Sequence, residues 1–215
     1  FGPILVEYYG GTEVGISHLC SSEDWLKKPG TVGSLTPNSR VAIYDDDGQP
    51  QGPGGIGEIY VKTEMVPDFD YKSLPDKRLE VERDGLISIG DIGYQDEDGY
   101  LFLCDRRNDM VISGGVNIYP AEIEAALVTM DGVGDCAVFG IPDAEFGESL
   151  MTMIEPEDNA ELSETAVREY LIERLAKYKV PKFIEFRKDL PREDSGKIMK
   201  RRLREPFWRD ADRQI

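Results

Sequence analysis

Two glycine-containing segments carry side chains that suit a nucleotide and its metal ion. Residues 8–15 read YYGGTEVG, where backbone amides and the Thr12 hydroxyl suit a phosphate and the Glu13 carboxylate suits Mg²⁺. Residues 90–93 read GDIG, and the Asp91 carboxylate between the glycines can accept hydrogen bonds from both hydroxyls of a ribose. Taken alone, each segment is more typical of an ordinary turn.

Two segments in the second half of the chain present glycines or a lysine to a ligand. Residues 109–124, DMVISGGVNIYPAEIE, join a strand-like run to a glycine pair and a helix start, and glycines let a ligand approach the backbone closely. Residues 191–197, PREDSGK, form a polar loop with one lysine, Lys197, whose charge suits a phosphate oxygen. The plain alternatives are a strand-to-helix connection and a solvent-facing lysine.

The charge balance argues against nucleic acid as a partner. The 215 residues include 25 basic and 42 acidic side chains, a net charge of −17, and an acidic surface repels phosphate backbones. A basic cluster between Lys197 and Arg204 is the local exception, and we interpret it as the solvated end of a helix. Hydrophobic residues make up 40% of the chain, yet no apolar run approaches the roughly 20 residues of a transmembrane segment.

The histidine and cysteine counts remove several enzyme classes. His18 is the only histidine, which excludes a histidine-rich metal site and leaves one candidate for a Ser-His-Asp site. Cys20, Cys104 and Cys136 are widely spaced and form no Cys-x-x-Cys, which excludes a zinc ribbon. Their odd number favours reduced thiols over a disulfide framework, and with them a cytoplasmic location.

Three motif matches fail on their context. Residues 52–57 fit G-x-G-x-x-G, but a strand follows them where a dinucleotide site needs a helix, so we predict a turn. The acidic segments 45–48 and 96–99 lack the ligand series and the closing glutamate of a calcium loop. Residues 195–197 read SGK but lack the upstream glycine and the following hydroxyl of a Walker motif.

The first half of the chain is predicted to be rich in β-strands. Dense Gly, Pro and Asp turns separate short apolar runs, a spacing typical of a small antiparallel sheet or barrel. Residues 66–84 carry many charges without periodicity and are predicted to form a surface segment, and residues 1–6 are predicted to form an apolar strand. Further strands are expected at 41–44, 58–62, 86–89 and 100–104.

After Asp105 the pattern changes to alternating helices and strands. A helix is predicted over 120–130, with Pro120 at its first position. A second helix is predicted over 163–177, capped by the Ser163 side chain. Strands are expected at 135–141, 150–155 and 183–186.

The predicted fold class is α+β. We expect a small β-rich, barrel-like subdomain followed by a compact α+β domain, with the boundary at the polar run RRND that begins at Arg106. Residues 1–105 would form the β-rich part and residues 106–215 the small C-terminal domain.

Together, the four chemistry-bearing segments resemble the adenylate-forming superfamily, which includes acyl-CoA synthetases, nonribosomal adenylation domains and luciferases. YYGGTE resembles its YGxTE motif, and PREDSGKIMKRRLR resembles its C-terminal lysine motif. The stretch GDIGYQDEDGYLFLCDRRNDMVISGGVNIYPAEIE resembles the longest signature of the family almost position by position. The resemblance runs from Tyr8 to about Leu203 and implies the C-terminal part of such an enzyme, with residues 1–105 as the end of its large AMP-binding domain and residues 106–215 as its small mobile domain.

The resemblance implies a nucleotide site in the β-rich part of the chain. The Asp91 carboxylate would hold the ribose hydroxyls, and Glu13 would bind Mg²⁺. The complete implied set of nucleotide-binding residues is Tyr9, Gly10, Gly11, Thr12, Asp91 and Arg106.

The same resemblance implies roles for residues of the second half. Asn108 stands at the hinge between the two domains, where the family usually has Asp or Lys. Ser113, Gly114 and Gly115 would border the tunnel for the pantetheine arm of CoA. Lys197 would contact the carboxylate and phosphate during adenylation, and is the implied catalytic residue.

The activity implied by the resemblance is the joining of a carboxylic acid, fatty or related, to CoA. ATP and the acid first give an acyl-adenylate and pyrophosphate, and the CoA thiol then attacks the adenylate. Rotation of the small domain about Asn108 would exchange Lys197 for Gly115 between the two steps.

One feature of the family is missing from this sequence. The Ser/Thr/Gly-rich phosphate loop that precedes YGxTE has no counterpart, so the resemblance implies roughly the C-terminal two-fifths of an enzyme and no activity for this chain alone. Two alternatives stay open: an adenylation domain that feeds a carrier protein, and a truncated chain that acts as a non-catalytic module. The sequence indicates neither the acid nor the oligomeric state.

Overall fold

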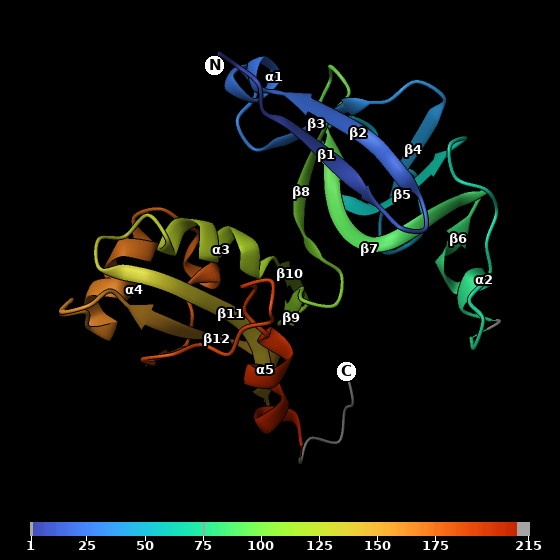
Figure 1. Ribbon diagram of the computed structural model, residues 1–215. Coiled ribbons are helices and arrows are strands. Elements are labelled where there is room, and N and C mark those ends of the chain that lie inside the picture. The colour runs from blue at the N-terminus through green and yellow to red at the C-terminus, as the bar shows by residue number, and fades with distance from the viewer. Residues whose placement is uncertain (1, 75, 210–215) are drawn as a thin grey trace. The chain divides into compact units, whose positions relative to one another are not determined.

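The computed structural model describes residues 2–74 and 76–209, and the chain divides into two compact units, residues 1–108 and 109–215 (Figure 1). The division follows Asn108, whereas the sequence places a domain boundary before Arg106. The first unit is built almost entirely from strands, and the second combines a smaller sheet with helices (Figure 1). The predicted α+β class is confirmed.

One sheet accounts for most of the first unit. Its eight described strands pair antiparallel in the order β1-β2-β3-β8-β7-β5-β4, with β6 beside β7. Two short helices, α1 (Ser22–Lys27) and α2 (Lys77–Val81), accompany the sheet. The strands are β1 (Val6–Gly11), β2 (Gly15–Ser21), β3 (Thr31–Leu35), β4 (Ser39–Tyr44), β5 (Gly57–Thr63), β6 (Glu82–Arg83), β7 (Leu86–Gln95) and β8 (Tyr100–Arg106).

The apolar residues of this sheet gather in one main core. Tyr9 and Val14 from the β1–β2 hairpin pack with Ile59 of β5, Ile87 of β7 and Leu101 of β8. These residues come from strands that are distant in the pairing order, so the sheet curves around its own apolar face, as the bent course of β7 shows (Figure 1). The curvature brings β1 close to β7, although no pairing between these two strands occurs in the described residues.

Three sequence predictions for the first unit need correction. The segment 66–84 is not purely superficial, because it contains α2 and the buried Arg78. Ile4 and Leu5 lie outside β1, which begins only at Val6, while Phe1 lies outside the described residues. The strand expected at 86–89 continues to Gln95, because the glycines at 90 and 93 lie within the strand and do not end it.

The second unit has a five-stranded sheet and three α-helices within its described residues. Four strands follow the order β10-β9-β12-β11, and β13 pairs parallel to β12. The strands are β9 (Val111–Ser113), β10 (Val116–Ile118), β11 (Val133–Asp143), β12 (Gly147–Pro156) and β13 (Phe183–Phe186). The helices are α3 (Pro120–Leu127), α4 (Glu164–Ile172) and α5 (Lys200–Trp208), with a 3₁₀ turn, η1 (Lys177–Lys179).

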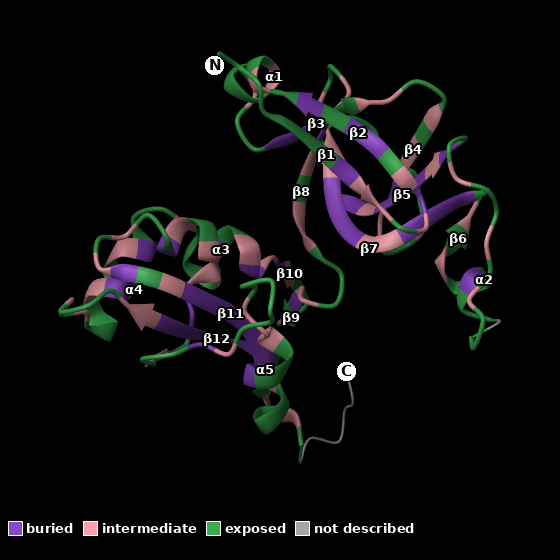
Figure 2. Cartoon of the chain, in the orientation of Figure 1, coloured by how far each residue is buried: buried purple, intermediate pink, exposed green. Residues whose placement is uncertain are grey.

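The two longest strands of this sheet, β11 and β12, consist largely of buried residues (Figure 2). Alternating residues of β11 point to opposite sides: Cys136 and Val138 face the core beneath α3 and α4, whereas Ala137 and Phe139 face a second core. Leu203 of α5 closes that second core. This double burial explains why β11 and β12 read as nearly continuous apolar runs.

Both predicted helices of the second unit end earlier than their apolar stripes suggest. α3 ends at Leu127, and α4 ends at Ile172 rather than at residue 177. Leu175 still packs against the core, because its amide bonds back to the Leu171 carbonyl at 2.8 Å in a turn after the helix. A turn can therefore continue the apolar stripe beyond the helix itself.

The basic cluster is mainly a solvated helix face, as predicted. Arg201 and Arg202 on α5 are exposed, but Lys200 pairs with Glu124 at 2.8 Å. In the described residues no helix is both long and apolar enough to cross a membrane. All three cysteines are free thiols, as expected from their number.

Leu171→Ala should destabilise the second unit by about 2–5 kcal/mol, because Leu171 is fully buried and its truncation leaves a cavity. The neighbouring Ile172 is 51% exposed on the same helix, so Ile172→Ala is the matched control and should cost far less. Urea unfolding can be followed through Trp208 in a Trp25→Phe background, since each unit holds one tryptophan. Equal losses in both variants would contradict the assigned core.

Candidate active site

The Asp91 carboxylate is the centre of the site in the first unit. Its Oδ2 accepts a hydrogen bond from the Tyr9 hydroxyl at 2.9 Å, and its Oδ1 lies 2.9 Å from Nε of Arg106. Asp91 and Tyr9 are buried, whereas the Arg106 side chain is 64% exposed. A buried carboxylate needs such partners, since an unpaired charge away from water is costly.

Strand pairing explains how these three residues meet. Asp91 on β7 stands directly opposite Arg106 on β8 in the antiparallel register. Tyr9 arrives from β1 because the sheet curves and places the β1–β2 hairpin in the same core as Ile87. The sequence places all three residues in the site, and the structure brings them together.

Burial, followed by the negative charge of Asp91, raises the pKa of the Tyr9 hydroxyl above its usual range. The hydroxyl therefore stays protonated and donates its hydrogen bond to the carboxylate. Each carboxylate oxygen of Asp91 keeps a lone pair beyond its present partner. The arrangement can accept two hydroxyls of a vicinal diol, which is the chemistry expected for a ribose.

A polar cleft of about 690 Å³ lies within the first unit, and Arg106 is the member of this group that lines it. Five of the sequence-predicted residues line it: Gly10, Gly11, Glu13, Arg106 and Asn108. Thr12 is exposed in the hairpin turn and is not among the lining residues. Of the six predicted nucleotide-binding residues, Gly10, Gly11 and Arg106 therefore line the cleft, whereas Tyr9, Thr12 and Asp91 are not among its lining residues.

The hairpin requires glycine at position 10 for a steric reason that the sequence motif does not show. A Cβ at this position would lie 1.9 Å from the carbonyl oxygen of Gly15 on the facing strand. The β1–β2 register shifts between Tyr9 and Gly10, so the two strands approach closely at this point. Gly10 is therefore required by the hairpin itself, whatever ligand approaches it.

Several cleft residues come from the segment 66–84, where sequence analysis predicted no function. Tyr71 donates a hydrogen bond to Oε1 of Glu13 at 3.2 Å, and Lys77 and Arg83 also line the cleft. Burial raises the pKa of Tyr71, and the Glu13 charge adds to this effect. An aromatic residue among charges was the only sequence signal for this wall of the cleft.

The acidic residues of the cleft fit a magnesium ion that is held mainly by its nucleotide. No group of three or more His, Cys, Asp or Glu side chains suited to a metal occurs in the described residues. Mg²⁺ commonly uses one or two protein carboxylates and takes its remaining ligands from phosphate and water. The half-buried Glu13 offers one such carboxylate, and Glu58 and Glu80 also line the cleft.

The glycine pair in the second unit forms the turn of a β-hairpin. Ser113 on β9 pairs with Val116 on β10, which leaves Gly114 and Gly115 as a two-residue loop. Their φ angles of 58° and 80° are both positive, as a type I′ turn requires. The turn itself therefore selects two glycines.

A second pocket, of about 430 Å³, lies beside this hairpin. Ser113 and Gly114 line it together with Lys177, Tyr178 and Lys182, while Gly115 is not among the lining residues. Phe146 lines it as well, so the pocket combines backbone, two aromatic rings and two cations. It lies entirely within the second unit.

Lys197 projects from a tight turn of the second unit. The Glu193 amide donates a hydrogen bond to the Lys197 carbonyl at 2.8 Å, and Arg192 and Ile198 form an isolated antiparallel β-bridge. The Lys197 side chain is exposed, and its Nζ has no hydrogen-bond or ion-pair partner in the described part of the chain. The ammonium group is therefore available to a ligand.

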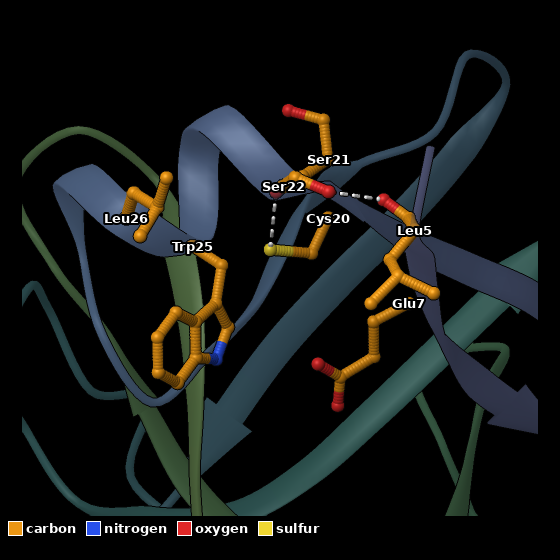
Figure 3. Close-up of a pocket in the computed structure, with 7 residues that line it drawn as sticks. All are labelled: Leu5, Glu7, Cys20, Ser21, Ser22, Trp25 and Leu26. Carbon is orange, nitrogen blue, oxygen red and sulfur yellow. Dashed lines mark hydrogen bonds between the residues drawn. The ribbon is translucent and has the colours of Figure 1, made fainter. Parts of the chain in front are cut away.

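A third pocket, of about 320 Å³, is largely apolar and contains none of the predicted site residues (Figure 3). Trp25 and Leu26 of α1 face Leu5 and Glu7 across it, with Cys20 between them (Figure 3). The Ser22 hydroxyl bonds to the Leu5 carbonyl at 2.9 Å and joins α1 to the N-terminal segment. Sequence analysis did not predict this pocket.

Comparison with protein families gives two matches along the chain. Residues 1–67 match the family described as AMP-binding enzyme, and residues 122–197 match the AMP-binding enzyme C-terminal domain. The chain belongs to the adenylate-forming superfamily. Residues 1–67 include the YGGTE segment, and residues 122–197 end at Lys197.

Curated relatives agree with this assignment. The long-chain-fatty-acid–CoA ligase FadD13 of Mycobacterium tuberculosis is 40% identical over 204 residues, which cover 94% of this chain and 40% of FadD13. A feruloyl-CoA synthase of an Amycolatopsis species is 39% identical over 207 residues, 96% of this chain and 42% of the synthase. The chain thus spans about two-fifths of the length of these relatives.

Solved structures of the superfamily match both units. ATP-bound MatB from Rhodopseudomonas palustris has a TM-score of 0.87 at 36% identity, over 99% of this chain and 42% of MatB. MenE from Bacillus subtilis, an o-succinylbenzoate CoA synthetase in complex with its acyl-adenylate intermediate, has a TM-score of 0.83 at 33% identity, over 94% of this chain and 41% of MenE.

The buried His18 should make the stability of the first unit depend on pH. Burial lowers the pKa of His18 to about 4, and its ring lies 5.9 Å from the Tyr9 ring. Since an unfolded histidine titrates near 6.5, protons bind the unfolded chain preferentially between these values. Stability should be complete above about pH 6.5 and fall by about 3 kcal/mol as the pH drops toward 4.

Urea unfolding of the first unit at pH 7 and pH 4.5, followed through Trp25 in a Trp208→Phe background, measures this loss. His18→Gln is the control, because it removes the histidine contribution and leaves that of the carboxylates. His18 is the only histidine, so one NMR titration reports its pKa directly. A midpoint near 6.5 in the folded protein would contradict the prediction.

Proposed function

We propose that this chain is the ribose-binding and lysine-bearing part of an ATP-dependent acid–CoA ligase of the AMP-forming type. The observation that carries the proposal is the buried Tyr9–Asp91 pair joined to Arg106, which lines the polar cleft. It offers a carboxylate with its charge already paired and with free lone pairs for a diol. The family membership and the named CoA ligases among the relatives support the same activity.

The reaction joins a carboxylic acid to CoA in two steps. The carboxylate oxygen attacks the α-phosphorus of ATP, which forms an acyl-adenylate and releases pyrophosphate. The CoA sulfur then attacks the acyl carbon, the C–O bond to the phosphate breaks, and AMP leaves. Fatty or related acids are the proposed substrate class, because the curated relatives include fatty-acid and feruloyl ligases.

In the first step the nucleotide would be oriented by the cleft of the first unit. Asp91 would accept the ribose hydroxyls, Arg106 would support the ribose, and Gly10 and Gly11 would lie against the adenine and α-phosphate region. Glu13 would hold Mg²⁺, which neutralises phosphate charge when bound. Tyr9 would fix the Asp91 carboxylate in place from beneath.

Lys197 would supply the positive charge that adenylation needs. Two negative groups, the acid and the α-phosphate, must approach one another, and an ammonium group between them offsets the repulsion. The free and exposed Nζ supports this role, as does the end of the C-terminal family match at this residue. The hinge role of Asn108 and the cytoplasmic location remain predictions.

In the second step the CoA thiol would reach the adenylate past the hairpin of Ser113, Gly114 and Gly115. The pocket beside this hairpin carries Lys177 and Lys182, which suits a phosphate-bearing thiol substrate. A carrier protein is the second candidate acceptor. One relative, the fatty acid–[acyl-carrier-protein] ligase ScoC of Streptomyces coeruleorubidus, is 37% identical over 217 residues.

Two assays test the proposal. Calorimetry should detect AMP binding to this chain, and ATP–pyrophosphate exchange should be found in the parent enzyme that includes it. Offering CoA or a phosphopantetheinylated carrier protein as the acceptor separates the two candidates. A chain that binds no adenine nucleotide, together with a parent enzyme without exchange activity, would favour the non-catalytic module.

Asp91→Ala should weaken AMP binding about 10- to 150-fold, because a hydrogen bond to a charged group is worth about 1.5–3 kcal/mol. The selectivity for AMP over 2′-deoxy-AMP should fall as well, and this ratio is insensitive to a general loss of stability. Asp189→Ala, which removes an exposed carboxylate of the second unit, is the control. Unchanged selectivity for AMP over 2′-deoxy-AMP would contradict ribose binding by Asp91 and would leave it a structural role only.

Lys197→Ala should lower adenylate formation by several powers of ten in the parent enzyme, and should largely spare thioester formation from preformed acyl-adenylate. Lys188→Ala removes another exposed lysine of the second unit and should leave both half-reactions unchanged. Gly115→Leu should show the reverse pattern if the hairpin borders the thiol path. Equal losses in both half-reactions of Lys197→Ala would contradict the division of roles.

A further inference from the structure

Glu58 on β5 lies at the junction of two hydrogen bonds close to the ribose-binding group. Its Oε1 accepts a bond from the Ser88 hydroxyl at 2.6 Å, and its Oε2 accepts one from Nη1 of Arg107 at 3.1 Å. The Glu58 side chain is only 17% exposed, and Ser88 is buried. A carboxylate in this position is held by its partners on both sides.

Both bonds continue to the same residue, Gly90. The Ser88 hydroxyl accepts a bond from the Gly90 amide at 3.0 Å, and the Arg107 amide donates to the Gly90 carbonyl at 2.8 Å. Glu58 is therefore linked to the Gly90 amide through the Ser88 hydroxyl, and to the Gly90 carbonyl through Arg107. Gly90 has a φ of 82°, a conformation that other residues rarely adopt.

The strand pairing shows why Gly90 needs such support. Glu58 pairs with Ile92 and Tyr60 pairs with Ser88, so residues 89–91 of β7 stand opposite the single residue Ile59. Such a bulge removes regular ladder bonds and re-aims side chains. The bulge contains Asp91. At the bulge the Ser88 hydroxyl satisfies the Gly90 amide, while the Arg107 amide continues the β7–β8 register at the Gly90 carbonyl.

The two consecutive arginines are divided between two carboxylates. Arg106 contacts Asp91, whereas Arg107 contacts Glu58 and lies 3.4 Å from Asp46. We propose that Glu58 is a positioning residue for the ribose-binding carboxylate, which it holds in place through Ser88, Arg107 and the Gly90 bulge. This inference rests on the proposed function, but its first readout needs no nucleotide.

Glu58→Gln and Ser88→Ala test the network in this chain. Each should accelerate hydrogen exchange of the Gly90 amide by about tenfold or more, as expected for the loss of one buried hydrogen bond. Each should also lower the preference for AMP over 2′-deoxy-AMP several-fold. Glu64→Gln and Ser39→Ala are the matched controls, because the Glu64 side chain is exposed and Ser39 bonds to Thr36.

In an Asp91→Ala background, Glu58→Gln should change the AMP preference no further, which a merely structural role would not produce. Unchanged Gly90 exchange in both variants would overturn the inference. Faster Gly90 exchange with unchanged ribose preference would overturn it as well, because the network would then support the strand and not the site. Failure of the unaltered chain to bind AMP would count against the proposed function, while Gly90 exchange would still decide whether Glu58 holds the bulge.

Discussion

The buried negative charge of Asp91 is the constraint on which the first unit depends. A carboxylate removed from water is tolerable only with partners, and both partners, Tyr9 and Arg106, come from other strands. The pairing of β7 with β8 supplies Arg106, and the curvature of the sheet supplies Tyr9. A sheet with another curvature or register would leave this charge unpaired. The stability of the fold and the geometry of the site therefore depend on the same contacts.

The same constraint explains why the strand is irregular at this point. A regular β7 would continue the ladder with β5, but the bulge at residues 89–91 interrupts it and turns Asp91 toward its partners. The bulge leaves the Gly90 amide without a strand partner, and the Ser88 hydroxyl accepts its hydrogen bond. The site is thus built on strands, which hold geometry more firmly than exposed loops do.

Sequence patterns predict this fold well where structure is local. The strand at residues 183–186 and the Ser163 cap follow from alternation and capping chemistry, and both occur as expected. The strand through Asp91 was predicted too short, because its two glycines resemble a turn until long-range pairing makes them a bulge. Tyr71 was missed for a similar reason, since only tertiary structure brings it to Glu13.

The motifs of this chain contain residues selected for two different reasons. Gly10 prevents a clash within its hairpin, and Gly114 and Gly115 provide the positive φ angles of a tight turn. Their presence is explained by the fold, so they say little about a ligand by themselves. Lys197 differs, because its turn uses only its carbonyl, and in the described residues its ammonium group contacts no partner. The local fold therefore does not require a lysine at this position. Of the residues in the C-terminal motif, Lys197 is the one whose presence the proposed contact with a ligand explains.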